Sequence, residues 1–161
     1  MNIYKHYSQD DVNIGSRFET RIKPVLEARF GALIQRSTID RNDQFDFSND
    51  KVFIDAKCRR NTKNQYPTTM VGENKVKMGL DLILQGKEVY FVFGFADVDC
   101  IWRLDRGEYE VNYGGRYDRG TPEIKSYAYV PIKYLHDIIK DAPQNDHVEE
   151  SPSRISEATP E

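Results

Sequence analysis

A near-continuous apolar run, VYFVFGF at residues 89 to 95, constrains the fold of this chain more than any other segment. A strand that is apolar on both faces must be covered on both faces. An amphipathic helix is expected before it, over residues 73 to 85, and CIWRL at residues 100 to 104 is expected to pair beside it. The run therefore predicts a central strand of a sheet that has helices on its faces.

Two long helices are expected to cover this sheet. Within the first 30 residues apolar side chains recur at helical spacing, Gly31 supplies a stop, and Pro24 is expected to kink or divide the helix. The helix over residues 73 to 85 is expected to bury one stripe of apolar side chains, formed by Val76, Leu80, Ile83 and Leu84.

The remaining segments complete a mixed α/β layout. They are expected to be a first strand at 32–38, a hairpin at 45–57, a polar loop at 58–69, an irregular loop or small hairpin at 105–125, an edge strand at 126–132 that Pro131 ends, and a short final helix at 133–140. The predicted order is helix, three strands, helix, then two or more strands.

Composition limits the remaining possibilities. Residues 1–140 are expected to form one domain, and residues 141–161 an acidic disordered tail, because the tail has six acidic side chains, one arginine and almost no large apolar residue. No apolar run is long enough to span a bilayer, so we expect a cytoplasmic protein without a membrane partner. Cys58 and Cys100 lack the spacing of a zinc site and are expected to be reduced packing residues.

Charged residues interrupt the predicted hairpin, FDFSNDKVFIDAK at residues 45 to 57. If its turn centres on Asn49-Asp50, Phe47 faces Val52, and alternation gives the two faces different roles. The expected core face carries Phe45, Phe47, Val52, Ile54 and Ala56. The opposite face carries Asp46, Asp55 and Lys57, with the two aspartates as diagonal neighbours.

Two carboxylates in a partly dry site repel each other, and a divalent cation removes that cost. Mg²⁺ prefers oxygen ligands and is usually held by one or two carboxylates together with water or phosphate oxygens. Glu19 lies beside the apolar stripe of the first helix and could add a third carboxylate. The alternatives are a solvated hairpin face with an incidental ion pair, and a surface Glu19 paired with Lys23.

Basic residues cluster around the hairpin. Residues 51 to 77 contain seven basic and two acidic side chains, which suits a phosphate backbone, although a solvated charged face is equally compatible. In the loop after the hairpin, Tyr66 could stack on a base or simply pack the loop. The expected nucleic-acid contacts are Arg59, Arg60, Lys63, Lys75 and Lys77; for Lys75 an ordinary helix-surface lysine is the alternative.

Over residues 13 to 104 the sequence resembles the PD-(D/E)xK nuclease superfamily, whose core is helix, three strands, helix, strand. Asp46 matches the acid of the second strand, Asp55-Ala56-Lys57 matches (D/E)-x-K, and Phe45 replaces the motif's proline. The segment GSRFE, residues 15 to 19, is similar to the start of archaeal Holliday-junction resolvases. The hairpin is similar to that of phage endonucleases that cut branched DNA.

The resemblance implies a restriction-endonuclease-like fold and a Mg²⁺-dependent endonuclease, with Mn²⁺ as a substitute, that hydrolyses DNA of branched or structured form and is often a homodimer. Asp46, Asp55, Glu19 and the Ala56 carbonyl would hold the metal, and Lys57 would orient water or neutralise charge. Two alternatives stay open. One is a catalytically silent nuclease-like domain that binds nucleic acid or a protein partner, and the other is a non-enzymatic protein whose hairpin charges are incidental.

Overall fold

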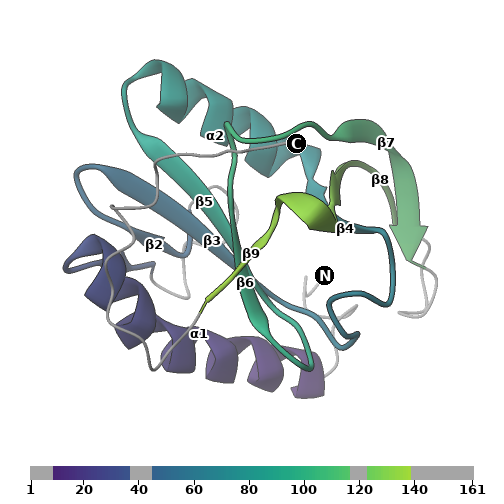
Figure 1. Ribbon diagram of the computed structural model, residues 1–161, viewed down its shortest axis with the longest axis horizontal. Coiled ribbons are helices and arrows are strands. Elements are labelled where there is room, and N and C mark those ends of the chain that lie inside the picture. Colours follow the sequence, from purple (N-terminus) through teal and green to yellow (C-terminus); the bar gives the residue numbers. More distant parts are fainter. Residues whose placement is uncertain (1–8, 37–44, 117–122, 139–161) are drawn as a thin grey trace, which may run out of the picture.

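The apolar run becomes strand β5 (Glu88–Gly94), which lies inside a mixed sheet of order β1-β2-β3-β5-β6-β9 (Figure 1). The computed structural model describes residues 9–36, 45–116 and 123–138, so the predicted tail lies outside the described residues. The other strands of this sheet are β1 (Ile34–Gln35), β2 (Phe47–Ser48), β3 (Val52–Cys58), β6 (Asp99–Arg103) and β9 (His136–Asp137). β5 runs parallel to β3 and antiparallel to β6, which confirms the predicted pairing with residues 100 to 104.

Helix α1 (Gln9–Phe30) covers one face of the main sheet (Figure 1). Its buried side chains, Phe18, Ile22 and Leu26, pack in one cluster with apolar side chains of β2, β3 and β5. The helix is not divided at Pro24, although proline removes one helical hydrogen bond, because this buried stripe continues on both sides of it. It ends as predicted at Gly31, which has a φ of 87°.

Helix α2 (Glu73–Leu84) lies on the opposite face and turns a different side toward the sheet than predicted. Val76 and Gly79 are buried, whereas Leu80 is exposed and Leu84 is 86% exposed. A Cβ at Gly79 would lie 2.6 Å from Leu104, so the missing side chain lets the helix approach the sheet on that side. This close approach turns Leu80 and Leu84 outward, and the predicted stripe is wrong at both.

A second, three-stranded antiparallel sheet shares the α2 face, in the order β4-β8-β7. Its strands are β4 (Thr68–Gly72), β8 (Glu123–Pro131) and β7 (Glu110–Arg116). Thr68 and Thr69, the first two residues of β4, were expected to be loop, and no strand was expected over the rest of β4. β8 was expected at an edge but lies in the centre, because it pairs with both neighbours. Pro131 ends β8 as predicted. Residues 105–125 were expected to be an irregular loop or a hairpin of their own; β7 forms there, but its partner β8 consists mostly of the segment expected as a separate edge strand.

The predicted final helix is wrong in the described part of that segment. Residues Ile132–Tyr134 form one short 3₁₀ turn, and His136–Asp137 then pair with β6 as edge strand β9. The backbone N–H of Ile138 donates to the Asp99 carbonyl, and Leu135 and Ile138 are buried. Pairing along a sheet edge therefore prevails over the helical pattern of this segment.

The β2–β3 hairpin keeps the predicted faces but not the predicted turn. Phe47 pairs with Ile54, so the turn centres on residues 50 and 51. The Asn49 side chain accepts hydrogen bonds from the backbone N–H of Lys51 and Val52, and this fixes the later turn. The pairing moves by two residues, which leaves every strand residue on its predicted face.

Phe45 is the exception to that assignment. It precedes β2 and packs against Phe53 and Phe91 on the α2 face, whereas Phe47 lies on the α1 face. The first strand also differs, since β1 spans two residues and part of the predicted segment lies outside the described residues. Both cysteines are free, as predicted. No helix in the described ranges combines the length and apolarity needed to cross a membrane.

Candidate active site

Asp55 is the most deeply buried charged group in the candidate site. It lies in β3 with 2% of its surface exposed, and the same face of β3 carries Lys57. The Lys57 Nζ atom lies 2.9 Å from Asp55 Oδ2, and Lys75 Nζ, on α2, lies 3.7 Å from Asp55 Oδ1. Despite the nearby ammonium group, Oδ2 accepts no well-aligned hydrogen bond from any described residue. One carboxylate oxygen therefore keeps capacity for a further ligand.

Asp46 lies beside Asp55 and links three strands. Its Oδ1 atom is 2.8 Å from Arg36 Nη2, just after β1, and its Oδ2 atom accepts a hydrogen bond of 2.8 Å from the Ala56 backbone N–H. Continuing the β2–β3 register by one step places Asp46 directly opposite Asp55. The two aspartates are therefore cross-strand neighbours, closer than the predicted diagonal arrangement.

The pKa values of the two aspartates shift in opposite directions. Burial, followed by the negative charges of Asp55 and Glu19, raises the pKa of Asp46 to about 7. Burial also acts to raise the pKa of Asp55, but the charges of Lys57 and Lys75 outweigh it and lower that pKa below its usual range. At neutral pH Asp55 is therefore ionised, whereas Asp46 is partly protonated.

Glu19 reaches the same region from α1. Its neighbour Phe18 is buried against the sheet, and Glu19, half-buried, accepts a hydrogen bond of 3.4 Å from Gln35 Nε2. Burial raises the pKa of Glu19, and the charges of Asp55 and Lys57 both act on it. The three predicted acids, Glu19, Asp46 and Asp55, thus lie close enough for their charges to affect one another's pKa.

The predicted nucleic-acid contacts divide into different environments. Lys75 is only 14% exposed, beside Asp55 and over the Phe45 ring, so it belongs to the acidic cluster. Lys77 is exposed and lies 3.8 Å from Glu73 on the helix surface. In the loop after β3, Arg60 is exposed. Arg59 donates to the Met70 carbonyl, and Lys63 pairs with Asp137.

The site suits a hard divalent cation. It offers Asp55 Oδ2, which pairs with Lys57 but accepts no well-aligned hydrogen bond from the described residues, and the lone pairs that Asp46 still has after its two contacts. The described residues contain no cluster of three His, Cys, Asp or Glu side chains placed to hold an ion on their own. Mg²⁺ commonly relies on one or two carboxylates with water and phosphate oxygens, so two buried aspartates fit it.

Sequence reasoning missed two parts of this cluster. Arg36 was not predicted, because its contact with Asp46 depends on how β1 pairs with β2 and no spacing signals it. Lys75 was assigned to nucleic acid, with a surface role as the alternative. No sequence signal shows that Lys75 faces the sheet, because its approach to Asp55 depends on the pairing of β4 with β8 just before α2.

Comparison with known proteins gives one structural likeness and one family. A search of curated proteins finds no match. Among solved structures, Hjc, a Holliday junction resolvase from the archaeal hyperthermophile Archaeoglobus fulgidus, is 14% identical with a TM-score of 0.46, over 77% of this chain and 96% of that one. That likeness is too weak to support a function. The family model described as "Phage putative PDDEXK endonuclease" matches residues 8–138, and the chain therefore belongs to this family.

Proposed function

We propose that the chain is a Mg²⁺-dependent endonuclease that hydrolyses phosphodiester bonds of DNA, most readily in branched or structured DNA. The observation that supports this most is the burial of Asp46 and Asp55 side by side with Lys57 at 2.9 Å. A purely structural hairpin gains nothing from two buried carboxylates that raise each other's free energy. The preference for branched DNA rests on the resemblance of the GSRFE segment to Holliday-junction resolvases.

The two buried aspartates are the proposed metal ligands that the geometry supports. Asp46 and Asp55 would hold Mg²⁺, for which Mn²⁺ would substitute. The Ala56 carbonyl and Glu19 are added as further ligands from the family resemblance, since Glu19 completes no three-carboxylate cluster in the described residues. When bound, the ion would polarise the scissile phosphate and lower the pKa of a bound water. Arg36 holds Asp46 from the side of β1, and the Ala56 N–H holds it from β3, so both contacts orient this carboxyl.

Lys57 supplies positive charge beside the reacting phosphate. The charge of Asp55 raises the pKa of Lys57, so its ammonium group stays protonated at neutral pH. It can therefore orient the attacking water or stabilise negative charge that develops on the phosphate oxygens. Lys75 Nζ, 3.7 Å from Asp55 Oδ1, adds a second positive charge beside the same carboxylate from α2.

A cleavage panel tests this proposal. Purified protein is incubated with Mg²⁺ or Mn²⁺ and a four-way junction, a flap, linear duplex and single-stranded DNA. We expect cleavage by the wild type, none by Asp55→Asn, and none by Lys57→Ala although that variant still binds DNA. Lys51→Ala is the matched control, because Lys51 is an exposed lysine in the turn at the opposite end of β3, and it should cleave at the wild-type rate.

Two outcomes would contradict the proposal. Absence of cleavage on all four substrates with Mn²⁺ would leave only a silent domain that binds nucleic acid or a protein. Full activity of Asp55→Asn would place the chemistry elsewhere. A homodimer, carried over from the resemblance to resolvases, is a separate proposal; light scattering should give the mass of two chains, and the mass of one chain would reject it.

A further inference from the structure

The loop between β3 and β4, residues 59–67, follows the strand that carries Asp55 and Lys57. We refer to these residues as the exit loop. It has three basic side chains and no acidic one, and its other residues include two asparagines, a glutamine, a threonine and a tyrosine. Amide, hydroxyl and basic side chains are those that commonly contact the sugars and phosphates of nucleic acids.

The backbone of the exit loop is held at its start, middle and end. Arg59 N–H donates to the Gly94 carbonyl, and the Asn61 carbonyl accepts from Ala96 N–H, so the loop is tied to β5 and the turn after it. The Lys63 N–H donates to Asp97 Oδ1 at 2.9 Å. At its end the Pro67 carbonyl accepts from Ile132 N–H. Its shape is therefore fixed before any partner binds.

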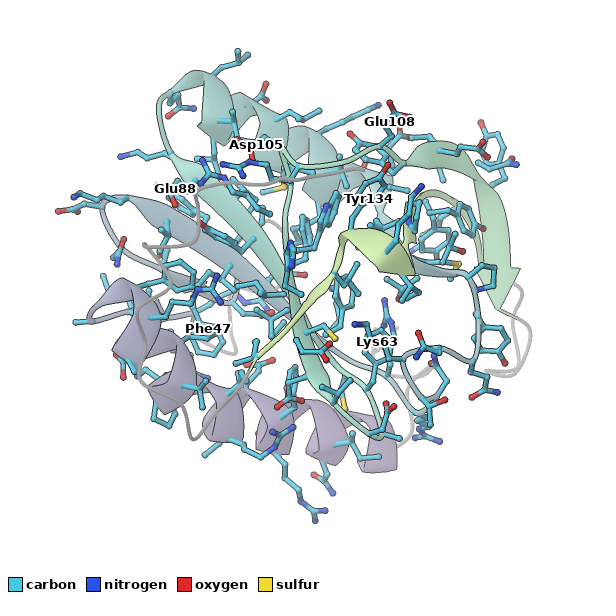
Figure 2. The ribbon with its side chains drawn as sticks, viewed as in Figure 1. Phe47, Lys63, Glu88, Asp105, Glu108 and Tyr134 are labelled. Atoms are coloured by element: carbon cyan, nitrogen blue, oxygen red, sulfur yellow. The ribbon has the colours of Figure 1, made fainter. Side chains whose placement is uncertain are left out.

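Two of the three basic side chains of the exit loop also hold the loop against the rest of the protein. Arg59 donates to the Met70 carbonyl of β4 and lies over the Phe93 ring. Lys63 Nζ lies 2.6 Å from Asp137 Oδ1 of β9, and Figure 2 shows Lys63 between the loop and that strand. Both residues were predicted to contact nucleic acid, which stays a prediction; in the structure both make contacts that attach the loop to the body of the protein.

The side chains that remain at the surface of the loop are Arg60, Thr62, Asn64, Gln65, Tyr66 and Pro67. Tyr66 is 55% exposed, and its hydroxyl accepts a hydrogen bond of 3.3 Å from Gln65 Nε2. A large aromatic side chain presented to solvent on a fixed backbone loses little conformational freedom when it binds a partner. Exposed aromatic side chains that stack on bases, together with positive charge that contacts the backbone, are the combination that binds unpaired nucleic acid.

We infer that the exit loop is a preformed surface for DNA that contains an unstacked base, with Tyr66 stacking on the base and Arg60 contacting phosphate. Arg59 and Lys63 position the loop. The inference rests on the proposed function, because it takes DNA as the substrate of the adjacent site. In fully paired duplex both faces of each base are covered by neighbours, so Tyr66 would favour junctions, flaps and single strands over duplex.

Fluorescence anisotropy in EDTA, where the proposed nuclease cannot cut, tests the inference on the full chain. The probes are a four-way junction, a flap, a single strand and a fully paired duplex of equal length. Tyr66→Ala should weaken binding to the first three by about tenfold and to duplex by less than twofold. Tyr66→Phe, which keeps the ring, and the control Lys51→Ala should stay within about twofold of wild type on every probe.

Arg60→Ala should weaken binding to all four probes by a similar factor and reduce the salt dependence, as loss of one phosphate contact does. Thermal unfolding of each variant checks that the fold is retained. A 2-aminopurine at the branch point gives a second readout, since its fluorescence should fall on binding to wild type and not to Tyr66→Leu.

The inference is overturned if Tyr66→Ala binds all four probes as wild type does, or loses affinity for duplex as strongly as for the junction. Failure of the proposed function looks different. If wild type binds these probes but does not cut them with Mn²⁺, the proposed nuclease activity is rejected. The effect of Tyr66→Ala on binding then still tests the role of the exit loop. Wild type that binds none of them rejects both.

Discussion

Replacement of Asp46 by asparagine tests the electrostatic basis of the site. The folded protein raises the pKa of Asp46 from 3.8 to about 7, chiefly by burial and then by repulsion from Asp55 and Glu19. A carboxyl with a raised pKa in the folded state binds more protons there than in the unfolded chain. Its contribution to stability is fully present below pH 3.8 and is lost as the pH rises through about 7.

The size of this effect follows from the difference between the two values. About 3 pKa units correspond to about 4 kcal/mol over the whole range, and about 2.5 kcal/mol of this is lost between pH 5 and pH 8. The Arg36 ion pair at 2.8 Å opposes the shift, so 2.5 kcal/mol is an upper value. Asparagine has nearly the shape of aspartate and cannot ionise, so it removes the pH-dependent part.

Urea unfolding in EDTA at pH 5 and pH 8 measures this pH-dependent part of the free energy of unfolding. Between these two pH values the wild type should lose up to about 2.5 kcal/mol of stability relative to Asp46→Asn. Any constant effect of the substitution cancels in this comparison. Asp81→Asn, on the exposed surface of α2, is the control and should follow the wild type at both pH values. Parallel behaviour of wild type and Asp46→Asn would refute the claim that the folded site resists ionisation of Asp46.

Two further predictions concern the packing of α1 and the acidic tail. Gly94→Ala should destabilise the protein by about 1–3 kcal/mol, because its Cβ would lie 2.6 Å from the Phe18 ring, whereas Gly15→Ala, with open space around it, should leave stability unchanged or slightly higher. Thermal unfolding measures both, and equal effects would contradict this account of the α1–β5 contact. Deletion of residues 141–161, which carry six acidic side chains, should tighten DNA binding at low salt, and unchanged affinity would reject a role for the tail.

Alternation and apolar runs made the centre of the fold predictable. The run at residues 89 to 95 indicated a strand covered on both faces, and β5 is that strand. In the hairpin, residues of the two strands that were predicted to share a face still share it when the pairing moves by an even number of residues, as it does here. The turn itself was mispredicted, because the sequence does not show that the Asn49 side chain caps the loop from outside it.

Elements that depend on distant partners were not predictable in the same way. The strand β4 begins in the segment predicted as a polar loop and is paired along its length by β8, some sixty residues later. The approach of Lys75 to Asp55 depends on this pairing, since β4 leads directly into α2. Gly79 shows the same limit for helix orientation, because only the folded contact with Leu104 reveals which side of α2 is buried.

A crystal soaked with Mn²⁺ tests the central claim most directly, because Mn²⁺ substitutes for Mg²⁺ and can be located by its anomalous scattering. The account predicts one peak in contact with carboxylate oxygens of both Asp46 and Asp55, at about 2.0–2.3 Å. In Asp55→Asn crystals that peak should disappear. Well-ordered wild-type crystals with no peak at these two side chains, or with the ion bound elsewhere, would contradict it.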